Sequence, residues 1–480
     1  MEDRNGIEFL FNKTILITGA TGFLAKVIVE KILRVQPNVK KLYLLIRAKD
    51  HNSALERLHS EITGKELFKV LRERYGAKFD SFISEKVAPI TGDTSLINLS
   101  LRGDNSNINK DIDVIIHAAA TTRFEERYDV ALGINTFGAK NIIHFAQTCP
   151  NLQIIVDVST AYVCGEKVGL IPETPQKMDI VGFNIDIEKK LVDKTLTHLI
   201  GKKVSTKEIR DTMRRLGQKR AELYGWPNTY VFTKAMGEKL IWEYKENLSV
   251  VIIRPTMISS TYKEPFPGWV EGVGSVATVS IVYGKGLVRF TYGDDNTIFD
   301  LIPTDMVVNS IVMAMMANAN KHCLKIYHVG SSLRNPLPFR KLLDINYQYF
   351  SNNPWIDGQG MLVKISKAIL VKRRLHSQIL FLLFIIVFMI LKLVDKASCH
   401  YYRLIQDKLL QIKVTYKIWK TFKPYTSFAG IFDDENTEKL RTTLCKNGEG
   451  EEVFNFDPKC INWEDYLLNN HIPATVKYLF

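Results

Sequence analysis

Cysteine is scarce in this chain and widely spaced. The six cysteines form no CxxC pair and no combination with histidine at metal-ligand spacing; they are Cys149, Cys164, Cys323, Cys399, Cys445 and Cys460. We therefore expect neither a disulfide framework nor a metal site, and a reducing compartment is the simpler interpretation.

Acidic residues are too few to balance the basic ones. The chain has 64 Lys and Arg residues against 51 Asp and Glu, a formal charge of +13. Such an excess favours contact with a phosphorylated ligand, a membrane surface or nucleic acid. Basic motifs interleaved with aromatic residues are missing, so we do not expect a nucleic-acid partner. At 46% hydrophobic residues, wholesale disorder is excluded.

Long apolar runs are also missing. Residues 379–391 contain no polar side chain, but a helix needs about 20 apolar residues to cross a bilayer. With Lys372, Arg373 and Arg374 before the run and Lys392 after it, the segment fits a helix at a membrane surface or a buried core helix equally well. The N-terminal stretch "MEDRNGIEFLFNK" is acidic and runs into a strand, so no signal or plastid transit peptide is expected and the first domain should face the cytosol.

Short runs rich in Val and Ile alternate with longer amphipathic segments. The apolar runs predict strands buried on both faces of a sheet, at residues 14–18, 41–47, 85–91, 113–119, 152–159 and 248–255. Helices are expected between them, among others at 24–35 and 233–246. This alternation predicts an α/β fold with a Rossmann-type, doubly wound parallel sheet. From about residue 355 the pattern turns helical, so we expect a catalytic domain over 1–354 and a mainly helical domain over 355–480.

A glycine-rich turn follows the first predicted strand, in "TILITGATGFLAKVIVEKIL". Gly19 allows the tight turn out of the strand, and Gly22 lets a pyrophosphate approach the backbone at the start of the helix. Ala25 is small enough for the helix to pack on the strand. A strand, a glycine turn and a helix in this order predict a dinucleotide site.

The ends of the following strands indicate which dinucleotide binds. Arg47 ends the second predicted strand, where an NAD site has an acidic residue, and a guanidinium there suits the 2′-phosphate of NADPH. A solvated strand end is the alternative. Asp93 is placed to accept from the adenine amino group, and small residues after the fourth strand let the cofactor lie close. The predicted cofactor-binding residues are Thr18, Gly19, Thr21, Gly22, Phe23, Leu24, Arg47, Asp93, Ala118, Ala119, Tyr230 and Lys234.

Catalytic groups are predicted from two further motifs. In "YVFTK", Tyr230 and Lys234 lie one helical turn apart on one face. An ammonium near the phenol, together with the positive nicotinamide, is expected to lower the pKa of the phenol towards neutrality, so that Tyr230 can exchange a proton with a substrate. In "VDVSTAYVCG", Ser159 and Thr160 leave a strand with hydroxyls that can hold a substrate oxygen.

The ordered set "TGATGFLA", "HAAA", "STAYV" and "YVFTK" resembles the extended short-chain dehydrogenases/reductases. In that family the tyrosine is the general acid or base, the lysine steadies it and binds the nicotinamide ribose, and a Ser or Thr binds the reacting oxygen; Thr160 takes that position here, with Ser159 beside it. Three further stretches resemble the alcohol-forming fatty acyl-CoA reductases, with plant-like detail: "VVIIRPTMISSTYKEPFPGWVEG", "DLIPTDMVVNSIV" and "FDPKCINWEDYLLNNHIPA". Cys164 departs from the pattern, which usually has Asn there.

The resemblance implies that NADPH reduces a long-chain or very-long-chain acyl-CoA, through an aldehyde, to a primary alcohol with release of CoA. It also implies the cytosolic face of the endoplasmic reticulum membrane as the location. Acyl chain length and oligomeric state are not predicted. CoA phosphates could meet Arg210, Arg214, Arg215, Lys219 and Arg220, which otherwise form a solvated helix face, and Phe266, Pro267 and Trp269 could line the acyl tail or pack internally. Trp463 and Asp465 in "NWEDYLLN" mark the family.

Other functions of the same fold remain open at this point. A sugar-nucleotide epimerase would share Tyr230 and Lys234 but would retain NAD, which Arg47 argues against. A membrane-associated sterol-type dehydrogenase would share the fold and an apolar segment, and it would take no CoA ester. A protein that binds NADP without turnover commonly lacks the Tyr or the Lys, and both are present here.

Overall fold

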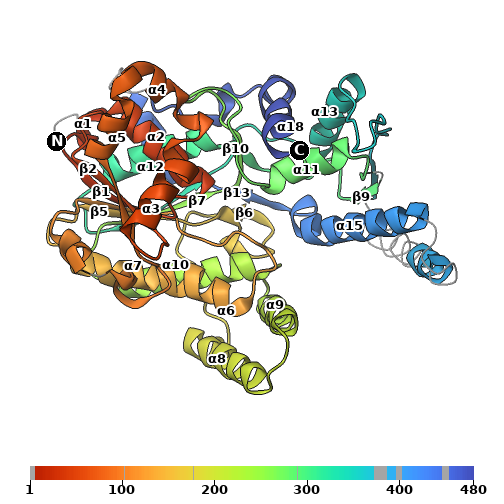
Figure 1. The fold of residues 1–480 in the computed structure, drawn as a ribbon, viewed down its shortest axis with the longest axis horizontal. Coiled ribbons are helices and arrows are strands. Elements are labelled where there is room, and N and C mark those ends of the chain that lie inside the picture. The colour runs from red at the N-terminus through yellow and green to blue at the C-terminus, as the bar shows by residue number, and fades with distance from the viewer. Residues whose placement is uncertain are drawn as a thin grey trace.

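The computed structural model describes residues 6–480 apart from 102, 177, 289, 372–385, 396–402 and 446–452. Its centre is a seven-stranded sheet in the order β11-β7-β5-β4-β1-β2-β3 (Figure 1). The strands are β1 (Thr14–Thr18), β2 (Lys41–Ile46), β3 (Val87–Thr91), β4 (Val114–His117), β5 (Ile154–Val158), β7 (Val250–Pro255) and β11 (Leu324–Val329). All neighbours pair in parallel. The expected Rossmann-type parallel sheet is thus confirmed.

All six strands predicted from apolar runs are present. The sequence analysis does not predict β11, which lies at the edge of the sheet and begins with partly exposed residues, so its apolar run is interrupted by Lys325. The strand order runs outward in both directions from β1 and β4. In such a doubly wound sheet, ligands bind at the carboxyl ends of the strands where the order reverses. The fold therefore predicts a ligand site at the carboxyl ends of β1 and β4.

Helices cover both faces of the sheet. Helices α2 (Phe23–Val35) and α12 (Thr304–Asn318) pack together on one face, whereas α7 (Gly138–Gln147) and α10 (Thr229–Tyr244) pack together on the other. The two cores follow the two-residue period of a strand, because Ile15 and Ile17 join one core and Leu16 joins the other. The remaining helices of this part are α1 (Gly6–Leu10), α3 (His51–Arg57), α4 (Lys69–Tyr75), α5 (Phe79–Lys86), α6 (Tyr128–Ala131), α11 (Ser275–Gly284) and α13 (Phe339–Asn352).

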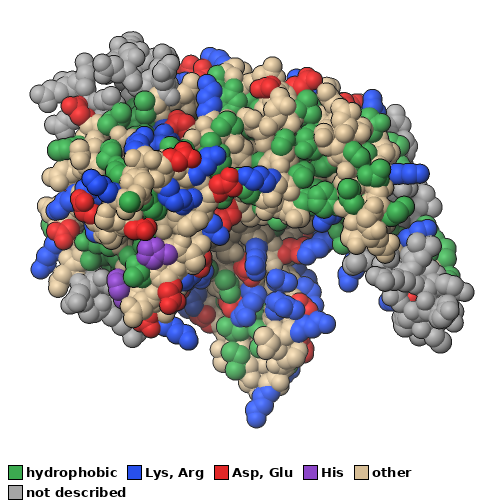
Figure 2. Space-filling view, turned by 45° about the horizontal axis from the view of Figure 1, so that its top comes forward, with side chains coloured by type: hydrophobic (Ala, Val, Ile, Leu, Met, Phe, Trp, Pro, Cys, Tyr) green, Lys and Arg blue, Asp and Glu red, His purple; other side chains and the backbone are tan. Residues whose placement is uncertain are grey.

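A helical hairpin projects from the body of the molecule below α6 (Figure 1). It consists of α8 (Ile185–Gly201) and α9 (Thr206–Leu223). Side-chain caps start both helices, because Asn184 accepts from the backbone N–H of Asp186 and Ser205 accepts from that of Glu208. Lys and Arg side chains gather on this projection (Figure 2), so part of the net positive charge of the chain is concentrated there.

The C-terminal residues return to the body of the molecule. They form α15 (Arg403–Thr426), α16 (Glu435–Cys445), α17 (Trp463–Asp465) and α18 (Ile472–Leu479), with three-residue strands β12 (Ile369–Val371) and β13 (Gly430–Phe432). These strands pair with β9 (Phe290–Tyr292) and β6 (Gly169–Ile171), and a further small pair joins β8 (Met257–Ser259) to β10 (Leu301–Pro303). The sequence pattern predicts a mainly helical part beyond residue 355, and the structure adds these two short strands to it. A domain boundary near residue 355 stays a prediction.

The "NWEDYLLN" motif attaches the C-terminal part to the body. The Trp463 indole donates to the backbone O of Asn335 over 3.0 Å. The Tyr466 hydroxyl, on a fully buried side chain, donates to the backbone O of Ser260 over 2.8 Å. Asp465 accepts from the side chain of Asn469 within the same segment. The motif, whose role the sequence does not explain, therefore acts as an internal anchor.

The apolar run 379–391 is only partly described. Residues 379–385 lie outside the described residues, and a helix covers 386–395. Its apolar side chains are about half exposed, including Ile386, Met389 and Leu393. Across the described parts of the chain, no helix is long and apolar enough to cross a membrane.

Candidate active site

The glycine turn lies between β1 and α2 and presses against the end of β4. Gly19 has φ +69°, and a Cβ added there would lie 2.7 Å from the backbone C and O of Ala118. The N–H of Gly22 donates to the O of Gly19 over 2.8 Å, which closes the turn. Helix α2 starts with no side-chain cap, and the N–H groups at a helix start favour an anion. This backbone cradle fits the pyrophosphate of a dinucleotide.

A cavity of about 780 Å³ opens beside this turn. The ends of β4 and β5, the start of α10 and the end of α15 form its walls. Of the residues predicted from sequence, those that line it are Gly19, Gly22, Phe23, Leu24, Ala118, Ser159, Thr160 and Tyr230. Thr18 and Lys234 are buried next to them, and the Thr18 hydroxyl accepts from the backbone N–H of Ala119 over 3.2 Å. The structure thus brings most of the predicted cofactor and catalytic residues to one place.

Six predicted cofactor residues do not line this cavity: Thr18, Thr21, Arg47, Asp93, Ala119 and Lys234. Arg47 is exposed and follows β2, at the same edge of the sheet as the glycine turn. Asp93 follows β3, and its carboxylate accepts from the backbone N–H and the hydroxyl of Ser95 over 2.9 and 2.8 Å. Asp93 therefore holds its own turn, and its contact with adenine stays a prediction.

Two hydroxyls lie where β5 ends. The backbone N–H of Ser159 donates to the O of Ile253 over 2.7 Å, which fixes the strand end. The Ser159 hydroxyl is buried and has no hydrogen-bond partner in the described part of the chain. The Thr160 hydroxyl makes only long contacts, 3.4 Å to the N–H of Tyr162 and 3.5 Å to the O of Pro255. Since buried hydroxyls are normally paired, both groups are suited to hold an oxygen of a ligand.

Helix α10 carries Tyr230 and Lys234. The Asn228 side chain caps its start by accepting from the N–H of Val231 over 3.1 Å. Burial, with the negative charge of Asp157 added, raises the pKa of Tyr230 above its usual value. Both effects oppose the lowering that is expected from Lys234 and the positive nicotinamide, because desolvation penalises the phenolate, and that lowering stays a prediction. Tyr230 is consequently a protonated phenol at neutral pH, which suits a proton donor.

Lys234 lies 3.8 Å from a carboxylate that the sequence analysis does not single out, Asp157 of β5. Both side chains are about 2% exposed. His117, at the end of β4, lies 3.9 Å from the other oxygen of Asp157. Burial lowers the pKa of His117 to about 3, with a smaller contribution from Lys234, so this imidazole is neutral. An acidic residue inside an otherwise apolar strand is the sequence signal that identifies Asp157.

Aromatic residues from a distant part of the chain close the cavity. The Tyr425 ring of α15 stacks on Phe124 with centroids 5.2 Å apart, and Phe124 stacks on Tyr230 at 6.2 Å. The side chain of Asn228 donates to the Tyr425 hydroxyl over 2.9 Å. Phe422 lines the cavity as well. Sequence analysis misses this wall, although the spacing of aromatic residues in "WKTFKPYTSF" is a signal for it.

The five basic residues of α9 that are predicted to meet CoA phosphates have different environments. Arg220 binds the buried Glu188, Arg215 donates to Thr212 over 3.0 Å, and Arg210 lies 3.7 Å from Asp211. Lys219 is exposed. Arg214 lines the cavity, and its Nε has no hydrogen-bond partner among the described residues. Of the predicted phosphate contacts, only Arg214 is placed at the cavity.

The aromatic residues of the "EPFPGWVEG" loop pack internally, whereas Glu271 and Gly272 at its end line the cavity. The Trp269 ring, on a buried side chain, contacts Tyr478 of α18 with centroids 5.1 Å apart and Phe266 at 6.3 Å. Neither Phe266, Pro267 nor Trp269 lines the cavity. Of the two possibilities left open for these three residues, the structure shows internal packing, and the end of α15 supplies apolar residues to the cavity wall.

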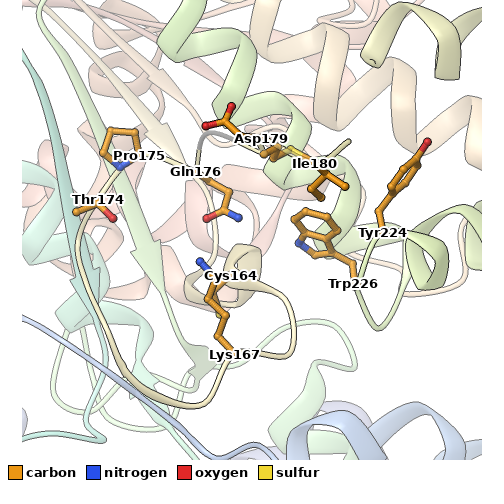
Figure 3. Close-up of a pocket in the computed structure, with 11 residues that line it drawn as sticks. Cys164, Lys167, Thr174, Pro175, Gln176, Asp179, Ile180, Tyr224 and Trp226 are labelled. Carbon is orange, nitrogen blue, oxygen red and sulfur yellow. The ribbon is translucent and has the colours of Figure 1, made fainter. Parts of the chain in front are cut away.

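A second cavity of about 690 Å³ is lined by residues from two stretches of the chain, 164–180 and 224–226 (Figure 3). Cys164, Gln176 and Trp226 are among its lining residues. Cys164 is buried, which raises the pKa of its thiol to about 11, so the thiol is not an activated nucleophile. Among the described residues, no group of His, Cys, Asp and Glu side chains could hold a metal ion.

Comparisons with known proteins agree over the whole chain. A family model described as male sterility protein matches residues 17–311, and a second model with the same description matches 381–480. The chain is 46% identical to an alcohol-forming fatty acyl-CoA reductase of Simmondsia chinensis, covering 100% of both chains. It is also 46% identical to a probable fatty acyl-CoA reductase 5 of Arabidopsis thaliana, covering 99% of both.

Solved structures support the fold. The terminal R domain of the myxalamid PKS-NRPS pathway matches with a TM-score of 0.58 at 16% identity, over 98% of this chain and 90% of that one. The reductase domain of a nonribosomal peptide synthetase from Mycobacterium tuberculosis matches with a TM-score of 0.57 at 16% identity, over 97% and 91%. From the full-length identity and the two family models, we conclude that this chain belongs to the alcohol-forming fatty acyl-CoA reductases, a family of oxidoreductases.

Proposed function

We propose that this protein uses NADPH to reduce a long-chain or very-long-chain fatty acyl-CoA to a primary alcohol through an aldehyde, with release of CoA. One observation carries the proposal. In a chain 46% identical over its full length to an alcohol-forming relative, Ser159, Thr160 and Tyr230 line one cavity beside the glycine turn. The apolar walls of that cavity, including Val273, Ile418 and Phe422, suit an acyl chain.

The residues of the chain have separate tasks in this reaction. The turn at Gly19 and Gly22 would hold the pyrophosphate of the dinucleotide, whose reduced nicotinamide would supply hydride. The hydroxyls of Ser159 and Thr160 hold the carbonyl oxygen and stabilise the negative charge that develops on it. Tyr230, kept protonated by burial, gives its proton to that oxygen when the alcohol forms. The aromatic wall of Phe124 and Tyr425 excludes water from the reacting carbon.

Product analysis tests the proposal. Purified protein would be incubated with NADPH and saturated acyl-CoA esters from C12 to C30, and lipid products identified by mass. We expect primary alcohols with free CoA, and the panel would give the chain preference. If NADPH binds but no ester is reduced, the proposed function is wrong and a sterol-type dehydrogenase becomes the better candidate.

NADPH rather than NADH is proposed as the cofactor because Arg47 lies at the expected position beyond β2. An Arg–phosphate hydrogen bond contributes about 1.5–3 kcal/mol, so Arg47→Ala should raise KM for NADPH roughly 10- to 100-fold. KM for NADH should not change. Lys41→Ala, at the opposite end of β2, is the matched control. An equal rise of KM for NADPH and for NADH would show that Arg47 does not bind the 2′-phosphate.

The CoA phosphates are proposed to meet Arg214, the cavity-lining member of the α9 basic residues. Arg214→Ala should raise KM for acyl-CoA about tenfold, the size expected for loss of one charge-assisted contact, with kcat nearly unchanged. Arg215→Ala removes the same charge one residue further along the same helix and should leave KM alone. Equal effects of the two variants would indicate general attraction by the basic hairpin instead of a defined contact.

We also propose that the protein works on the cytosolic face of the endoplasmic reticulum membrane. The half-exposed apolar side chains of residues 386–395 support this, because such a face favours the lipid–water boundary. Flotation with vesicles of endoplasmic reticulum lipids is the test, and Ile390→Glu together with Leu393→Glu should abolish it. Flotation that persists in the double variant would rule out this helix as the contact.

A further inference from the structure

Asp157 is a charged residue in the middle of the sheet. It lies in β5, with β4 and β7 pairing on either side, and its side chain is 2% exposed. Neither carboxylate oxygen has a hydrogen-bond partner in the described part of the chain. Burying a carboxylate without hydrogen bonds costs free energy, and that cost raises the pKa of Asp157 to about 6. A residue kept at such a position needs an explanation other than stability.

The charged groups around Asp157 come from two elements. Lys234 and Glu238 lie on α10, and His117 lies on β4. Glu238 is already bound by Arg254, over 2.6 Å to one of its oxygens, and His117 is neutral. Lys234, with its Nζ 3.8 Å from Asp157, is therefore the cation that pairs with Asp157. At that distance the two groups attract each other without a direct hydrogen bond.

The other side of Asp157 leads to the glycine turn. Nδ1 of His117 lies 2.8 Å from the hydroxyl of Thr18, the residue before Gly19. In the tautomer whose Nδ1 accepts from that hydroxyl, the Nε2 proton faces Asp157. The Nε2 atom is buried and has no other partner among the described residues. A continuous series of side chains, Thr18, His117, Asp157 and Lys234, thus runs beneath the cavity from the cofactor turn to the catalytic helix.

We propose that Asp157 is a positioning residue of the reductase, which holds the Lys234 ammonium below the cavity and keeps Tyr230 in its protonated, proton-donating form. The proposal rests on the function proposed above. Asp157 touches neither the cavity nor the reacting atoms, so it acts only through Lys234 and Tyr230. A negative charge beneath Tyr230 disfavours the phenolate, and a neutral phenol is the form that reduction requires.

Removing the Asp157 carboxylate should change how the rates of aldehyde reduction and alcohol oxidation depend on pH. Without Asp157 the pKa of Tyr230 falls, because one of the two causes that raise it is gone. Reduction of an aldehyde needs the protonated phenol of Tyr230, so the pH at which the reduction rate falls should become lower. Oxidation of the alcohol needs the phenolate, so its gain of rate should move in the same direction by the same amount. A merely structural role of Asp157 predicts neither shift.

Stability alone does not separate the two explanations. A carboxyl whose pKa is raised by folding stabilises the fold below its unfolded pKa and loses that contribution as pH rises through about 6. Asp157→Asn, however, leaves the buried Lys234 ammonium without its partner, which lowers the thermal midpoint whichever explanation holds. The pH profiles therefore decide between them.

The test measures pH profiles of aldehyde reduction and alcohol oxidation for the wild type, Asp157→Asn and Asp305→Asn. Asp305 is also fully buried, but it accepts from the backbone N–H groups of Tyr262, Lys263 and Glu264, so it controls for loss of a buried charge. In Asp157→Asn only, we expect the fall of the reduction rate at high pH and the rise of the oxidation rate to move to lower pH. The expected shift is about half a pH unit or more, the effect of one nearby charge on a pKa. Asp157→Ser carries the same test if the Asn variant does not fold.

The outcomes are distinct. Unmoved profiles would overturn the inference and leave the proposed function standing, because the wild type would still reduce the aldehyde. A wild type that reduces no aldehyde would overturn both. An equal shift in Asp305→Asn would show a general effect of buried charge and would also overturn the inference.

Discussion

Replacement of Tyr230 by phenylalanine is expected to lower kcat by about 1,000-fold, within the range found for a lost general acid. The ring remains, so its stacking on Phe124 at 6.2 Å is kept and KM for NADPH should change little. Only the proton that reaches the carbonyl oxygen is removed. Steady-state kinetics with the aldehyde and with the acyl-CoA would measure the loss separately for each reduction.

Tyr128→Phe is the control for this experiment. Tyr128 is also a buried tyrosine packed against Phe232, but its hydroxyl binds Glu188 over 2.8 Å and does not line the cavity. It should lose some stability and no more than a small part of kcat. If Tyr230→Phe retains more than about one tenth of kcat, well short of a general-acid effect, the proton comes from another group and the catalytic assignment is wrong.

Gly19→Ala is expected to weaken NADPH binding by at least about 100-fold, equivalent to about 2.7 kcal/mol. The added Cβ would lie 2.7 Å from backbone atoms of Ala118 and Ala119, and the residue has φ +69°. Backbone atoms cannot rotate away as a side chain can, so the turn must move and the cradle for the pyrophosphate is lost. Quenching of protein fluorescence by NADPH would measure the affinity.

Gly182→Ala separates collision from backbone strain. Gly182 has φ +78°, and a Cβ there would meet nothing within 4 Å. Both variants should lose about 1–2 kcal/mol of stability from the left-handed conformation, the collision should add to that loss in Gly19→Ala alone, and only Gly19→Ala should lose NADPH. Normal NADPH affinity in Gly19→Ala would mean that the cofactor does not lie on this turn.

The sequence predicts those features that depend on a few neighbouring residues: the strands, the glycine turn and the Tyr230–Lys234 pair. Six strands follow from their Val and Ile content, since burial on both faces demands it. Gly19 identifies the turn because few other residues adopt its positive φ. Tyr230 and Lys234 share a helix, so their spacing alone places them on one face. In each case the information lies within a few neighbouring residues.

The parts that depend on distant contacts are not predicted. Phe422 and Tyr425 are nearly 200 residues beyond Tyr230 in the sequence, and only the fold brings α15 to the cavity. The raised pKa of Tyr230 has the same origin, because burial and Asp157 oppose the effect expected from Lys234. Arg214 is distinguished from its neighbours on α9 only by facing the cavity. Sequence supplies the groups, and tertiary packing decides their environment.

One measurement tests the central claim most directly, namely that this chain reduces an acyl thioester twice at one carbon. The protein would be incubated with a saturated acyl-CoA and NADPH that carries deuterium at both C4 positions, and the mass of the alcohol determined. The account predicts two deuterium atoms on the alcohol carbon, one from each reduction, and free CoA equal to the alcohol formed. An alcohol with a single deuterium, or an aldehyde that accumulates without further reduction, would contradict it.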